Sequence, residues 1–303
     1  MSHMRKRFAF FFAAGLLAVA SFTEAPVVSA QAQQGESMTV SPVSRKLSVD
    51  AGATASGKIT IVNDGSLAYD FMLYARPYSI VGDRYDTPDF KTVTDTSDVY
   101  KWVTFPQTKY TIAAGATITA DYTMRVPKDA APGGHYGIIF AETQPSGQQP
   151  SGSMILRKKR TGSILYVTVN GDYKLSGSEG AWSIPAWQPL PPLRASLSAR
   201  NDGNADFTDT TRLVVKDVFG KTKYDVKKEY QVLPGTTRTM DLEWAKALWF
   251  GFYKVEIQQE FLGKSYKHDG YVLMMPRFVP LLLVFMIIIG IAYAYVRRRK
   301  TKR

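Results

Sequence analysis

Apolar and polar residues alternate one by one along much of the chain, which is the pattern of a β-strand with one buried face. The alternation is unbroken over residues 118–126, and shorter alternating runs occupy 195–199, 240–244 and 253–257. Residues 164–169 are apolar on both faces, as in a strand at the centre of a sheet. Helical periodicity is weak between the two ends of the chain. These patterns predict an all-β protein.

Turn signals recur beside the alternating runs. Asn63-Asp64-Gly65 and Asn201-Asp202-Gly203 each follow such a run, and Gly-containing turns that end in Thr precede one at 51–54, 114–117 and 234–237. Asn-Gly and Asp-Gly sequences supply the positive φ that tight turns need. Because the same order of turn and strand occurs twice, the sequence predicts two β-sandwich domains, immunoglobulin-like in the broad sense. A place for Asp64 or Asp202 in an active site is the alternative to a turn.

A stretch rich in Gly and Pro divides the two predicted domains. It argues against core strands and predicts a linker over 171–189, in which Trp182 and Trp187 are expected to pack between the domains. The first β-sandwich domain is predicted over 37–170 and the second, immunoglobulin-like, over 190–275. The chain has no Cys, so the disulfide pattern of true immunoglobulin domains is absent.

The N-terminus predicts a secretory signal peptide over 1–30. Arg5-Lys6-Arg7 forms a positive segment, residues 8–22 form a short apolar run, and small residues allow cleavage after Ala30 or Ala32. An uncleaved anchor is the alternative. Cleavage would place the following domains outside the cytoplasm.

The C-terminus predicts a transmembrane helix over 278–296, followed by a basic tail over 297–303. The 19 uncharged residues would span about 28 Å as a helix, close to a hydrocarbon core of about 30 Å. Four basic residues follow at once, which favours a cytoplasmic C-terminus and an extracellular ectodomain in a single-pass protein of the cell membrane. A buried core helix is the alternative.

The basic ends also explain the formal net charge of +12. Residues 1–30 carry +2 and residues 277–303 carry +7, so the middle of the chain keeps only +3. No nucleic-acid partner is therefore expected.

No catalytic constellation is visible in the sequence. His135 and His268 are the only histidines outside the N-terminal segment, and the Gly-x-Ser-x-Gly motif of many hydrolases is absent. We therefore expect a structural role for both histidines, no enzyme activity, no cofactor and no metal site. The Asp-rich segment 82–98 leaves two alternatives open: calcium binding, or solvated turn residues.

Arg157, Lys158, Lys159 and Arg160 form the densest basic run outside the tail. They could form a patch that binds an anionic wall polymer, or they could guard a strand edge against pairing. The preceding segment 143–153, rich in Gly, Pro, Ser and Gln, is predicted to be an exposed loop.

Several of these features together resemble one family. The strand that ends in Val62-Asn63-Asp64-Gly65, the Pro-Gly-Gly-x-Tyr-Gly sequence that begins at Pro132, and the basic run before 164–169 are similar to the WxL-interacting surface proteins of Gram-positive bacteria. The resemblance implies a peptidoglycan-binding first sandwich, a host-binding second one, and non-catalytic binding to peptidoglycan or another wall polymer and to surface proteins with WxL domains.

Two further classes of function stay open. One is an assembly component of the cell surface that acts only through protein contacts, such as pairing at a sheet edge. The other is a hydrolase.

Overall fold

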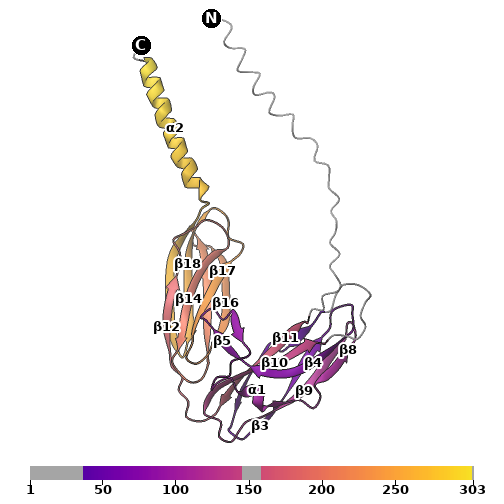
Figure 1. The fold of residues 1–303 in the computed structure, drawn as a ribbon. Coiled ribbons are helices and arrows are strands. Elements are labelled where there is room, and N and C mark those ends of the chain that lie inside the picture. The colour runs from indigo at the N-terminus through magenta and orange to yellow at the C-terminus, as the bar shows by residue number, and fades with distance from the viewer. Residues whose placement is uncertain (1–36, 145–157, 302–303) are drawn as a thin grey trace. The chain divides into compact units, whose positions relative to one another are not determined.

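The computed structural model describes residues 37–144 and 158–301, and the predicted signal peptide lies outside them (Figure 1). Two β-sandwiches follow one another along the chain, and an apolar helix follows the second. The prediction of an all-β protein with two sandwich domains is confirmed.

The first sandwich consists of a four-stranded sheet, in the order β1-β3-β9-β7, and a five-stranded sheet, in the order β2-β11-β10-β4-β8. The strands of the first sheet are β1 (Thr39–Ser41), β3 (Thr54–Val62), β9 (Thr117–Arg125) and β7 (Val103–Thr104). Those of the second are β2 (Ser44–Val49), β11 (Arg160–Val169), β10 (Gly133–Thr143), β4 (Tyr69–Pro77) and β8 (Lys109–Ile112). A one-turn helix, α1 (Val99–Trp102), precedes β7, and a small hairpin, β5 (Ser79–Val81) with β6 (Thr87–Asp89), follows β4.

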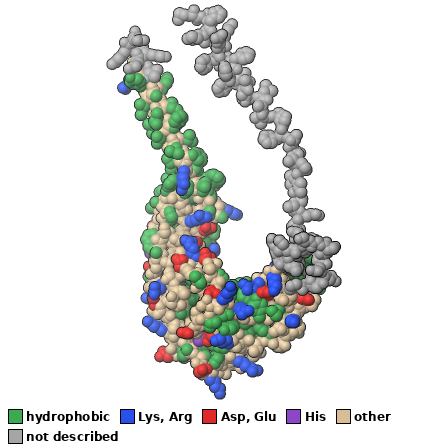
Figure 2. Space-filling view, in the orientation of Figure 1, with side chains coloured by type: hydrophobic (Ala, Val, Ile, Leu, Met, Phe, Trp, Pro, Cys, Tyr) green, Lys and Arg blue, Asp and Glu red, His purple; other side chains and the backbone are tan. Residues whose placement is uncertain are grey.

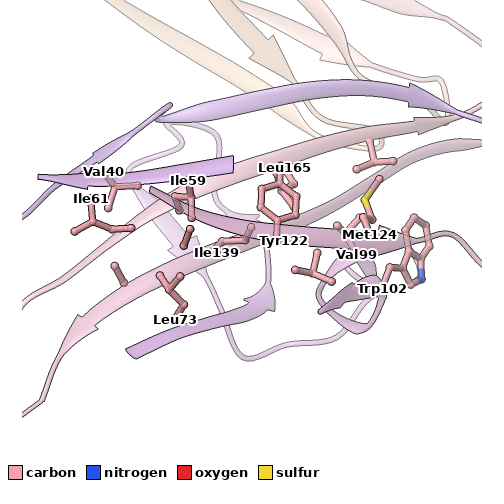
Figure 3. Close-up of a cluster of buried hydrophobic side chains, with 14 of the residues drawn as sticks. Val40, Ile59, Ile61, Leu73, Val99, Trp102, Tyr122, Met124, Ile139 and Leu165 are labelled. Carbon is pink, nitrogen blue, oxygen red and sulfur yellow. The ribbon is translucent and has the colours of Figure 1, made fainter. Parts of the chain in front are cut away.

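The core of the first sandwich lies between its two sheets (Figure 3). Ile59, Ile61 and Tyr122 point inward from β3 and β9 and meet Ile139 and Leu165 of the opposite sheet. Strand β9 covers the longest alternating run of the sequence, and its apolar residues are the inward ones. Strand β11 pairs on both sides, as predicted for a central strand.

The second sandwich has a three-stranded sheet, in the order β12-β14-β17, and a five-stranded sheet, in the order β13-β19-β18-β15-β16. The first sheet contains β12 (Gly177–Ser183), β14 (Leu193–Asn201) and β17 (Thr237–Trp244). The second contains β13 (Trp187–Gln188), β19 (Lys264–Met274), β18 (Gly251–Phe261), β15 (Phe207–Asp217) and β16 (Thr222–Val232). Its core gathers Leu197, Leu213, Val255 and Ile257, all fully buried or nearly so.

The stretch predicted as a linker, 171–189, contains strands β12 and β13. Both lie at the edge of a sheet, where Gly and Pro are tolerated because one side of the strand needs no partner. Trp182 and Trp187 are about half exposed, at 47% and 45%, and belong to these edge strands.

The C-terminal helix α2 (Phe278–Thr301) begins at the residue predicted for the transmembrane helix and continues through most of the basic tail. Its segment Phe278–Tyr295 is long and apolar enough to cross a membrane and is not buried by other described parts of the chain. The buried core helix that the sequence left open as an alternative is therefore excluded.

Candidate functional site

One side of the first sandwich leaves two strand edges open. The chain runs along β1 in one sheet, crosses over through Pro42 and Val43, and continues as β2 in the other sheet. Strand β1 pairs with β3 only from Thr60 to Val62, so residues 54–59 have no strand beside their outer edge in the described structure. Strand β2 pairs with β11 and is itself the outer strand of its sheet. Because only two residues separate β1 from β2, the two open edges lie on the same side.

Within residues 37–144 and 158–301, the outer edge of β2 presents backbone groups at alternate residues that no other strand uses. The carbonyls of Val43 and Val49 accept hydrogen bonds from β11 and the residue after it, at 3.0 and 2.8 Å. In a parallel pair, bonding residues alternate with residues whose N–H and C=O point the other way. Ser44, Lys46 and Ser48 therefore direct their backbone groups away from β11. This edge can accept another strand.

A cavity of about 650 Å³ lies between the two open edges. It is lined by Pro42, Ser44, Arg45, Lys46, Ser56, Gly57, Lys58 and Asp121. Three of these residues are cations and only Asp121 is an anion, and Asp121 already pairs with Lys58 Nζ at 2.9 Å. The cavity is therefore suited to a negatively charged group such as a carboxylate.

Gly57 allows the Arg45 side chain to lie in this cavity. A Cβ atom at position 57 would lie 2.3 Å from both Arg45 Nη1 and Tyr122 Oη. Because glycine leaves this space free, Arg45 reaches across to Tyr122 and donates a hydrogen bond of 3.4 Å. Leu47 and Val49 lie partly buried against the core beside it and offer apolar contacts to an incoming side chain.

The predicted basic patch lies elsewhere, on the outer face of the five-stranded sheet. Arg157 is outside the described residues. Lys158 Nζ lies 3.5 Å from a Glu142 carboxylate oxygen. The Lys159 carbonyl accepts a hydrogen bond of 2.9 Å from the Thr143 N–H, and the Lys159 N–H donates one of 3.0 Å to Thr143 Oγ1. The Arg160 guanidinium lies over the Phe140 ring, 4.4 Å from its centre. These contacts engage Lys158 and Arg160 with their own sheet, and binding of an anionic polymer by the run stays a prediction.

Both histidines bind a neighbouring carboxylate. His135 is buried, with Nδ1 2.8 Å from an Asp98 oxygen and Nε2 2.8 Å from the Ala131 carbonyl. Burial alone would lower the pKa of His135, but the hydrogen bond and charge of Asp98 and the Ala131 carbonyl together raise it above its ordinary value. Because both ring nitrogens face acceptors, the charged imidazolium fits this site. His268 bonds Glu179.

The Asp-rich segment joins the two sandwiches. The hairpin of β5 and β6 places the Asp83 carbonyl 2.7 Å from the backbone N–H of Thr239 on β17. Tyr85 Oη accepts a hydrogen bond of 2.9 Å from the Leu233 N–H. Among the described residues, no three His, Cys, Asp or Glu side chains gather in a way that could hold a metal ion. The sequence left calcium binding or solvated turn residues open for this segment, and it did not predict a contact between the two sandwiches.

The comparisons with known proteins give structures but no family. No family model matches the chain, and no curated protein sequence does. The chain is similar to the fimbrial chaperone CfaA, with 10% identity and a TM-score of 0.39, over 78% of this chain and 99% of that one. It is similar to the YadV chaperone, with 15% identity and a TM-score of 0.39, over 77% of this chain and 98% of that one. It is similar to the E. coli chaperone DraB, with 12% identity and a TM-score of 0.38, over 78% of this chain and 98% of that one.

The prediction of a WxL-interacting surface protein is wrong: no family model matches the chain, and the solved structures reported above are chaperones. The peptidoglycan and WxL-domain partners that it implied have no support. The Pro-Gly-Gly-x-Tyr-Gly sequence has a packing role in this structure. A Cβ at Gly133 would lie 2.6 Å from the Asn204 carbonyl, and a Cβ at Gly134 would lie 2.0 Å from Tyr136 Oη. Packing therefore demands glycine at both positions in this structure.

Proposed function

We propose that this protein is a non-enzymatic assembly protein that binds an extended segment of another protein by adding it as a strand to the edge of β2. The observation that carries the proposal is the row of outward backbone groups at Ser44, Lys46 and Ser48 beside a cationic cavity. Main-chain hydrogen bonds supply affinity in this mode of recognition, and pockets for alternate side chains supply specificity. Arg45 and Lys58 would select a segment with a carboxylate.

The proposal rests on this edge and not on the likeness to chaperones, which holds only at low TM-scores. It agrees with the assembly role through sheet-edge pairing that the sequence left open. The proposed partner of this protein is therefore a polypeptide and not the wall polymer expected from the sequence.

We further propose that the two sandwiches are exported and anchored by α2, with the tail in the cytoplasm. The signal-like N-terminus, the apolar segment Phe278–Tyr295 and the basic residues after it support this topology. Protease added to intact cells stripped of their wall should remove the sandwiches and leave a small C-terminal fragment. A tail epitope that is accessible from outside would contradict this topology.

The strand-addition proposal is tested by two substitutions at one residue. Lys46→Pro removes an outward N–H that β11 does not use, whereas Lys46→Ala removes the side chain and keeps the N–H. The probe is a peptide selected from displayed nine-residue segments with alternating apolar residues. An unmet backbone acceptor costs about 1–3 kcal/mol, so Lys46→Pro should weaken peptide binding by about 5- to 150-fold.

Lys46→Ala serves as the matched control, because both substitutions remove the Lys46 ammonium from the cavity and only Lys46→Pro also removes the N–H; the expected loss is therefore measured relative to Lys46→Ala. Both variants should keep the fold, since proline is tolerated on the outer side of an edge strand. Equal binding by the two variants would show that the peptide does not pair with β2.

A further inference from the structure

The end of the second sandwich that leads to α2 gathers several turns and loops. Strand register places them there. Met274, the last residue of β19, pairs with Gly251, the first of β18, and Asp217, the last of β15, pairs with Tyr253. Leu193 at the start of β14 pairs with Trp244 at the end of β17. The segments 189–192, 218–221 and 245–250 therefore meet at the same end as the connection to the helix.

These segments expose large apolar side chains at their tips. Phe219 is 91% exposed, and Trp249 and Phe250 are each 63% exposed. We call this set the apolar end; it consists of Leu190, Val218, Phe219, Leu248, Trp249 and Phe250. Figure 2 shows hydrophobic side chains at the end of the second sandwich from which the helix leaves. An exposed cluster of this kind marks a surface that another phase or molecule covers.

The connection to α2 keeps the apolar end close to the start of the helix. Strand β19 ends at Met274 and the helix begins at Phe278, four residues later, which an extended chain spans in about 14 Å. Part of the connection is fixed, because Met275 N donates to the Gln188 carbonyl at 3.1 Å and Trp187 Nε1 donates to the Met275 carbonyl at 2.9 Å. If the helix crosses a bilayer, the apolar end lies at the level of the lipid headgroups.

The composition of this end suits a lipid surface. Trp is enriched where a protein meets the headgroup region, because its ring is amphipathic. Exposed cations accompany the apolar side chains at the same end, namely Lys221, Lys246 and Arg277. Such a combination of apolar tips and cations matches acyl chains and the phosphates above them.

We propose that the apolar end inserts into the outer surface of the membrane, so that the second sandwich stands on the bilayer beside its own anchor. This inference rests on the proposed anchoring by α2. It gives the loops a partner, the lipid bilayer.

The natural absence of Cys allows a direct test on the full chain, since one introduced Cys carries a single nitroxide label. The variants are Phe219→Cys and Phe250→Cys at the apolar end, Lys264→Cys at the opposite end of the same sandwich, and Ile288→Cys within α2. Each protein is reconstituted in vesicles of phosphatidylcholine and phosphatidylglycerol. Spin relaxation by oxygen, which concentrates in lipid, is compared with relaxation by a water-soluble nickel chelate.

Labels at 219 and 250 should respond to oxygen more than to nickel, as the label at 288 does, and the label at 264 should show the reverse. If the labels at 219 and 250 respond to nickel as strongly as the label at 264 while the label at 288 is protected, the apolar end does not insert and the anchoring stands. If the label at 288 also responds to nickel, the anchoring fails and the inference falls with it.

Discussion

Replacing Asp209 by Asn should stabilise the second sandwich at neutral pH. Asp209 lies on β15, is fully buried, accepts a hydrogen bond of 3.0 Å from Thr211 Oγ1, and is bonded by Gln259 Nε2. Burial raises the pKa of the Asp209 carboxyl from 3.8 to about 6, against the hydrogen bonds from Gln259 and Thr211. A rise of this size means that the ionised carboxylate costs about 3 kcal/mol in the folded state.

The sign of the pH dependence follows from the raised pKa. Between about pH 4 and pH 6 the folded protein binds more protons at Asp209 than the unfolded chain does, so its stability falls as the pH rises through that range. Asp209→Asn should remove this part of the dependence and add up to about 3 kcal/mol at pH 7, with little gain at pH 4. Because the Asn side chain has one acceptor oxygen, which Thr211 Oγ1 uses, the Gln259 amide turns over so that the new NH2 group donates to Gln259 Oε1, an atom without a hydrogen-bond partner among the described atoms.

The assay is denaturant unfolding of the purified protein in detergent micelles at several values of pH from 4 to 8. Asp225→Asn on the adjacent strand β16 is the matched control. Asp225 is exposed and accepts hydrogen bonds of 2.8 and 2.6 Å from Arg212, which hold the pKa of its carboxyl below the usual range. That substitution should cost a little stability at pH 7 instead of adding any. A loss of stability in Asp209→Asn at pH 7, or a pH dependence equal to that of the natural protein, would refute the reasoning.

Three further outcomes follow from the contacts described above. The pKa of His135, measured by NMR titration, should lie above about 6.5. The protonated His135 then stabilises the fold fully below about pH 6.5, and this stabilisation is lost as the pH rises through the raised pKa. A measured pKa below about 6.5 would contradict a charged imidazolium at this site. Leu233→Ala should cost about 2–4 kcal/mol of unfolding free energy, because Leu233 is buried among aromatic side chains of the first sandwich, whereas Leu233→Met should cost less than about 1.5 kcal/mol. Gly57→Val should displace Arg45 from Tyr122 and weaken binding of the selected peptide, and unchanged affinity would exclude Arg45 from the site.

The sequence predicts the strands best where one face is buried. The alternation over 118–126 marks β9 because each second side chain enters the core, and the burial along the strand follows it. Strand β12 escaped prediction because it is an edge strand, where Gly costs little and alternation is weak. The hairpin of β5 and β6 escaped because its polar tip finds its partners on the other sandwich.

The candidate site could not be predicted from local pattern. The alternation of polar and partly buried residues over 44–48 indicates a strand. It does not indicate which edge of that strand is left without a neighbouring strand. That depends on the parallel pairing of β2 with β11, more than a hundred residues later, and on the short reach of β1 along β3. For the basic run, the sequence shows the density of charge but not its contacts: Arg160 lies over an aromatic ring of its own sheet, and binding of an anionic polymer by the run stays a prediction.

Amide hydrogen exchange along β2 tests the central claim most directly. In the free protein, the amides of Ser44, Lys46 and Ser48 should exchange fast, while those of Arg45 and Leu47, which face β11, should exchange slowly. Addition of the selected peptide should slow the three fast amides and leave the alternate ones unchanged. Protection that appears on another strand, with the three amides of β2 still fast, would contradict strand addition at this edge.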